Sequence, residues 1–120
     1  MGRKLRATLE INGVMLTKVA DSMLLDSVAE TFREVFSEEF GVVFYDYLER
    51  TFSITRTLIP ERLDEFQSAL SKTFGQSASS VLAKAIAKRL YLRVGLRFAE
   101  KPGYTLLQYI REAETNLENR

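Results

Sequence analysis

Two arginines stand within the apolar sector of a helix that we predict over residues 77–94, and their position has a clear chemical consequence. At about 100° per residue, Arg89 and Arg93 fall on the same side of this helix as Leu82 and Ile86. Arg93 is close to the helix end, where a long side chain can reach solvent. Arg89 is in the middle of the sector, where its charge would be buried. A buried charge that loses its partner costs about 3–5 kcal/mol. We therefore predict that Arg89 forms a structural ion pair with a carboxylate of the acidic stretch 21–49, and that this pair is not catalytic.

The other face of the same helix carries a basic patch with an aromatic residue, Lys84, Lys88 and Tyr91. Basic side chains interleaved with aromatic ones are typical of nucleic-acid-binding surfaces. Predicted helices over 60–74 and 77–94, joined at Gly75, also resemble a helix-turn-helix in outline. Against this reading, the second helix is too apolar for a recognition helix, and the net charge is only +1. The competing interpretation is a solvated basic face.

Small polar residues at the start of the same helix suggest an anion contact through Ser77, Ser79 and Ser80. Free backbone N–H groups and hydroxyls at a helix N-terminus can hold a phosphate or a carboxylate. The segment lacks the Lys-Ser/Thr ending of a nucleotide-binding P-loop, and no predicted strand precedes it. A helix cap followed by a tight turn is the favoured reading, because caps are much commoner than ligand sites.

Carboxylates are numerous between residues 30 and 46, and a hard cation such as Mg²⁺ needs only oxygen ligands. They are Glu30, Glu34, Glu38, Glu39 and Asp46. Carboxylate di-metal sites in helical bundles combine glutamate with histidine, which this chain does not contain. A solvated acidic face is therefore the favoured interpretation, and we expect neither a metal nor a cofactor.

The absence of both cysteine and histidine limits the function further. Without cysteine there are no disulfides, no thiol catalysis and no structural zinc of the usual kind. Without histidine the commonest general base is missing. No apolar run approaches the roughly 18 residues of a membrane-spanning helix. We expect a cytoplasmic protein that is not an enzyme and does not enter a membrane.

The charges are distributed asymmetrically along the chain. Residues 21–49 hold eight acids and one base, a local charge of −7, whereas residues 66–101 hold seven bases and one acid, a local charge of +6. Such an asymmetry can be neutralised inside the fold, between molecules or by an outside partner.

The elements that must position these residues are predicted to form one domain over 1–120, mainly α, with about five helices around a central apolar helix (77–94). An N-terminal β-hairpin is predicted over residues 4–19, because apolar and polar residues alternate on either side of Asn12-Gly13. A loop leading into an early helix is the alternative.

Two amphipathic helices are predicted next. Asp21 or Ser22 is expected to cap the first, which runs to about Phe36, and Ser37 is expected to cap the second. The apolar stripes expected to face the core are Leu24, Leu25, Val28, Phe32, Val35 and Phe36 in the first helix, and Phe40, Val43, Phe44, Tyr47 and Leu48 in the second.

Three further helices follow. Pro60 suits the first turn of the third helix, which is expected to end at Gly75. The fourth is the central helix, and Thr105 is expected to cap the fifth after a loop over 96–104.

Residues 37–95 contain a pattern of core-type residues that resembles a known family. The segments are Ser37-Glu38-Glu39-Phe40-Gly41, Phe44-Tyr45-Asp46-Tyr47-Leu48, Ile59 to Phe66, and Phe74-Gly75 followed by Val81, Leu82, Ile86, Leu90 and Tyr91. Over about half of the chain, this pattern is similar to small archaeal helical domains, the Nitrosopumilus-type output domains, found alone or attached to archaeal signalling proteins. The resemblance implies an archaeal, cytoplasmic interaction or output module, and it brings no enzymatic residues with it.

The function expected from the sequence is therefore a non-enzymatic protein–protein interaction or signalling output module whose partner is another protein or a second copy of the chain, as in a homodimer. The alternative is a nucleic-acid-binding regulator that uses the 60–74 and 77–94 helices.

Overall fold

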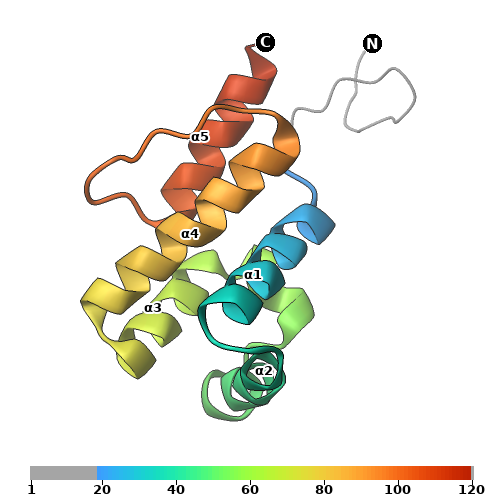
Figure 1. Ribbon diagram of the computed structural model, residues 1–120, viewed down its shortest axis with the longest axis vertical. Coiled ribbons are helices and arrows are strands. Elements are labelled where there is room, and N and C mark those ends of the chain that lie inside the picture. Colours follow the sequence, from blue (N-terminus) through green and yellow to red (C-terminus); the bar gives the residue numbers. More distant parts are fainter. Residues whose placement is uncertain (1–18, 120) are drawn as a thin grey trace.

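The computed structural model describes residues 19–119, which form five α-helices and one 3-10 helix and contain no strand (Figure 1). The elements in chain order are α1 (Asp21–Val35), α2 (Glu38–Phe52), η1 (Arg56–Glu61), α3 (Leu63–Phe74), α4 (Gln76–Val94) and α5 (Leu106–Glu118). The mainly helical prediction is confirmed. The hairpin predicted for residues 4–19 lies outside the described residues, apart from Val19.

Helix α4 lies across the middle of the molecule, with α1, α3 and α5 packed around it (Figure 1). Its buried residues fall on several sides of the helix: Ser79, Leu82, Ala83, Ile86, Ala87, Leu90, Tyr91 and Val94. A helix that is apolar around most of its circumference must be surrounded by other elements to remove those side chains from water. The prediction of a central apolar helix is confirmed.

Phe32 of α1 connects this core to α2. It is 1% exposed, and its ring centroid lies 5.2 Å from that of Phe44 and 6.4 Å from that of Phe66 on α3. Edge-on and tilted ring contacts of this kind add to the free energy gained by burial. The aromatic centre therefore ties α1, α2 and α3 together.

Two of the predicted helix caps are present. The Ser37 hydroxyl accepts a hydrogen bond from the Phe40 N–H at 3.0 Å. Thr105 accepts from the Gln108 N–H, and the Gln108 side chain accepts in return from the Thr105 N–H, which completes a capping box. At α1 the prediction was wrong: the N-cap is Ala20, with no side-chain hydrogen bond, and Asp21 is the first helical residue.

The start of the third helix also differs from the prediction. Pro60 lies inside η1, and α3 begins three residues later at Leu63. Arg62 separates the two elements, because its φ of −130° and ψ of 48° are not helical. Its guanidinium donates to the Ser53 carbonyl at 2.6 Å and pairs with Glu65. Proline tolerates a helix start, but the chain leaves the helical conformation at Arg62, which is bonded to the Ser53 carbonyl nine residues earlier, and α3 begins after it.

None of the helices in residues 19–119 combines the length and apolar character needed to cross a membrane.

Candidate interaction surfaces

Four side chains join α1 to α4 in what we call the ion-paired seam: Glu30 and Glu34 from α1, Arg89 and Arg93 from α4. Arg89 pairs with Glu34 and approaches Glu30, with 3.5 Å between Nε and Oε1. Arg93 donates from Nη1 and Nη2 to the two carboxylate oxygens of Glu30 at 3.2 and 3.3 Å. The ion pair predicted for Arg89 is thus present, and its partners belong to the acidic stretch of the sequence.

The seam also changes the titration of its central carboxylate. Hydrogen bonds from Arg93 lower the pKa of Glu30, desolvation opposes them, and the charges of Arg93, Arg89 and Arg33 lower it further. A carboxylate whose ionised form is held in this way stays charged at lower pH than a free glutamate. The seam therefore neutralises part of the charge asymmetry within the fold.

Other basic residues of the region are paired in the same way. Lys84 contacts Glu100 at 3.0 Å, and Lys101 contacts Glu112 at 2.8 Å. Lys88 is exposed and has no ion-pair partner in residues 19–119. Of the basic residues singled out in the sequence, Lys88 is thus the one left available for an outside anion.

A groove of about 670 Å³ runs beside the seam. Its lining residues are Glu30, Glu34, Lys88, Arg89, Leu92, Leu96 and Phe98. Leu92 on its rim is 80% exposed. The groove mixes an apolar wall with charges that are mostly already paired, so it lacks the run of free cations that a phosphate backbone requires.

Tyr91 does not belong to the basic face, and its predicted place there was wrong. The side chain is 1% exposed, and its hydroxyl donates to the Tyr109 carbonyl at 2.7 Å. Burial raises the pKa of Tyr91. Helix α4 is enclosed on more sides than the sequence pattern suggested, because α5 and Phe98 cover this position.

The three serines at the start of α4 differ in their exposure to solvent. Ser77 and Ser80 are exposed, but Ser79 is 2% exposed and donates to the Gln67 carbonyl at 3.3 Å. The hydroxyl of Ser79 therefore joins α4 to α3 and is not available to an anion. Its predicted role as an anion contact is corrected accordingly.

The acidic stretch does not gather into a metal site. Within the described part of the chain, no group of three or more aspartates or glutamates is placed to hold an ion together. Glu30 and Glu34 are used by the seam, and Asp46 pairs with Arg50 at 2.9 Å on the surface of α2.

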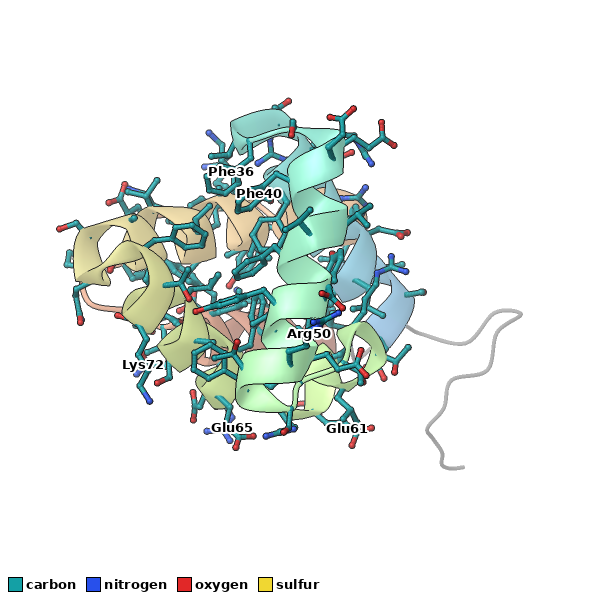
Figure 2. All side chains as sticks on the ribbon, turned by 90° about the horizontal axis from the view of Figure 1, so that it is seen from below. Phe36, Phe40, Arg50, Glu61, Glu65 and Lys72 are labelled. Atoms are coloured by element: carbon teal, nitrogen blue, oxygen red, sulfur yellow. The ribbon has the colours of Figure 1, made fainter. Side chains whose placement is uncertain are left out.

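The second candidate surface consists of six rings between α2 and α3, which we call the aromatic face: Phe36, Phe40, Phe44, Tyr47, Phe52 and Phe74. Successive rings along the chain lie 4.1, 5.7, 5.8 and 5.9 Å apart between centroids, from the first to the fifth. Phe74 of α3 lies 5.4 to 6.0 Å from the first three. Figure 2 looks onto this side, with Phe36 and Phe40 near one end of α2 and Arg50 toward the other.

Part of this face remains open to solvent. Phe36 and Tyr47 are exposed, Phe40, Phe52 and Phe74 are partly buried, and Phe44 is buried. Among the elements packed against α2, α1 makes the closest contact, and the space toward α3 is filled by the rings themselves. The face is a contiguous apolar surface of the kind that marks a protein contact.

Val43 extends the open surface along α2 and is 64% exposed. Val42 is 70% exposed, but it lies about 100° around the helix from Val43 and faces another side. The predicted apolar stripes placed Val35, Phe36, Val43 and Tyr47 toward the core, and the structure corrects this by placing them at the surface. A signal was available in the sequence: the apolar residues of α2 span a wider sector than α1, the element packed most extensively against it, can cover.

Comparisons with family models, with curated proteins and with solved structures gave no match to this chain.

Proposed function

We propose that this chain is a non-enzymatic protein–protein interaction module and that it binds another protein chain through the aromatic face. One contrast carries the proposal. Of the basic residues singled out on α4, all except Lys88 are paired within the fold, whereas Phe36, Val43 and Tyr47 of the apolar surface remain exposed.

The free energy available at the two surfaces favours a protein partner. Covering apolar area stabilises a complex by about 25 cal/mol for each Å² removed from water. Aromatic side chains are enriched among the residues that dominate binding at protein interfaces. Paired arginines and lysines would first have to leave their carboxylates before they could bind phosphates, which reduces the gain from a nucleic acid.

The biological setting follows from the family resemblance and is part of the same proposal. An archaeal signalling output domain acts by contacting another protein, so an interaction surface is the feature that it needs. We accordingly place the module in the cytoplasm. The chain has no cysteine, so an oxidising compartment would give it no disulfides.

The proposal is tested by placing a photo-crosslinking amino acid at Val43 in the full-length chain in cells. Val42 is the matched control, because it is the next residue of the same helix and is equally exposed but faces another side. We expect a protein to be cross-linked at Val43 well above the level at Val42. Once purified, the cross-linked protein should bind the wild-type chain in isothermal titration calorimetry, and its affinity for the Val43→Glu variant should be lower. Equal or absent cross-linking at the two positions would contradict the proposal.

A nucleic-acid-binding regulator is the second candidate, supported by Lys88 and Arg97, which are exposed and unpaired in the described residues. Fluorescence anisotropy of labelled DNA and RNA across a salt series tests it. Saturable binding that weakens steeply with salt, and weakens again in Lys84→Glu and Lys88→Glu, would support this candidate over the first.

A further inference from the structure

We infer that the chain covering the aromatic face is a second copy of this protein, with the α2 helices of the two copies packed antiparallel. The inference rests on the proposed function, because it names the partner of the same surface. Three observations carry it: the side of α2 that is exposed, the order of charges along that side, and the length between those charges.

The exposed side of α2 is apolar at its centre. At about 100° per residue, Phe40, Val43 and Tyr47 lie within about 60° of one another, next to the rings that fill the space toward α3. In an antiparallel pair of α2 helices, a two-fold axis midway between positions 43 and 47 brings Val43 of each copy opposite Tyr47 of the other. An isologous contact of this kind buries the same apolar residues twice.

The charges on this side are ordered so that a reversed copy complements them. Glu39 is in the first turn of α2, and Arg50 is the single basic residue of the helix, in its last turn. When the helices run antiparallel about that axis, Arg50 of the second copy lies opposite Phe40 and one residue from Glu39. An arginine can then contact both a carboxylate and an aromatic face. Reversal also sets the two helix dipoles in opposition, which is favourable.

The remaining acids of α2 do not oppose this arrangement strongly. Glu38 and Glu49 lie about 120–140° around the helix from Val43, outside the contact. Asp46 remains, and it pairs with Arg50 of its own copy through Nε at 2.9 Å, which leaves the two Nη groups of Arg50 to donate to Glu39 of the other copy. Each copy thus contributes two acids and one base at the contact, a small net repulsion that salt would screen.

Substitution of the central valine tests the contact. The oligomeric state of the full-length protein is measured by sedimentation velocity over a wide concentration range. We expect a reversible dimer whose dissociation constant rises by about a hundredfold in Val43→Glu, since two buried valines are lost per dimer. Val42→Glu is the matched control and should dimerise as the wild type does.

A charge exchange provides a test that a purely structural effect cannot imitate. Glu39→Arg and Arg50→Glu should each weaken the dimer, and the double variant should recover most of the affinity. Eleven residues separate the two positions, or about 16 Å along one helix, so the side chains cannot pair within one copy. Recovery therefore reports a contact between copies.

The outcomes separate this inference from the proposed function. A monomer at every concentration, a dimer that Val43→Glu leaves unchanged, or a double variant that fails to recover would each overturn the inference. If the chain is monomeric but a different protein is cross-linked at Val43 in cells, the proposed function stands with another partner. If the protein cross-linked at Val43 is a second copy, both are supported.

Discussion

The ion-paired seam and the aromatic face differ in how their side chains are satisfied. Each contains side chains that are more stable in contact with a partner group than alone: charges at the seam, and rings and a valine on the aromatic side. At the seam, Arg89 and Arg93 reach Glu30 and Glu34 across two packed helices, so the charges are satisfied inside one molecule. On α2, Val43 stays 64% exposed within residues 19–119, and Tyr47 is only partly covered by neighbouring rings and by Thr73 of α3.

Reach explains the difference. At the seam the α1 and α4 backbones are already packed together, and long, flexible arginines span the remaining distance to the carboxylates. Rings and valines are short, so they are covered only when another backbone comes within packing distance. Charge asymmetry in a sequence is therefore a weaker sign of an outside partner than an apolar stripe that exceeds the available neighbours.

The largest effect expected is at Phe32, which lies where the core meets α2. Phe32→Ala should lower the free energy of unfolding by about 3–5 kcal/mol, because it leaves a cavity among Phe44, Tyr45 and Phe66. Urea denaturation followed by circular dichroism measures this. Val43→Ala serves as the comparison and should cost far less. Similar losses for the two would mean that the α2 surface is part of the core.

A smaller effect is expected from Tyr91→Phe, which tests whether α4 is a buried element or a contact surface. Removing the hydroxyl removes its hydrogen bond to the Tyr109 carbonyl, which keeps its place in helix α5, and should cost about 0.5–1.5 kcal/mol of unfolding free energy. Binding of a partner and dimerisation should be unchanged in native buffer. Loss of binding at unaltered stability would instead place Tyr91 at the interface.

The seam predicts a dependence of stability on pH. The pKa of Glu30 is lowered in the folded protein, so its contribution is present above its ordinary value of 4.5 and is lost as pH falls through the folded pKa. Glu30→Gln should therefore be less stable than the wild type at pH 7, and the difference should shrink as the pH falls below 4.5. Thermal melts across this range measure it. A constant difference would show that ionisation of Glu30 is not what stabilises the seam.

The smallest effect should be seen at the α2 surface. Val42→Glu and Val43→Glu are each expected to change the unfolding free energy of the monomer by no more than about 0.5 kcal/mol, as exposed substitutions usually do. Guanidinium titrations at low protein concentration, with far-UV circular dichroism, check this. A large loss in Val43→Glu alone would show that α3 covers the position in solution.

Local signals predicted much of the fold. The caps at Ser37 and Thr105 and the central position of α4 depend on residues close together in the sequence, and all three are confirmed. The ion pair of Arg89 was predictable as well, because a charge inside an apolar sector requires a partner. Which carboxylate it meets was not, since that depends on how α1 crosses α4.

The incorrect predictions share a cause. Pro60 was expected to start α3, but Arg62 holds the chain in a non-helical conformation through contacts with Ser53 and Glu65. Tyr91 and Ser79 were expected at the surface, yet α5 and α3 cover them. The contacts with Ser53, Gln67 and Tyr109 join residues 9, 12 and 18 positions apart, beyond the reach of a pattern within one helix.

By itself, the sequence determined the helical class, several helix ends and the presence of an apolar excess, because periodicity and capping act over a few residues. The tertiary structure alone decided which apolar residues are covered. Both Phe32 and Val43 fit an amphipathic stripe, but Phe32 is enclosed by α2 and α3, and Val43 is not. Burial depends on the elements that pack nearby, and a pattern within one helix does not contain that information.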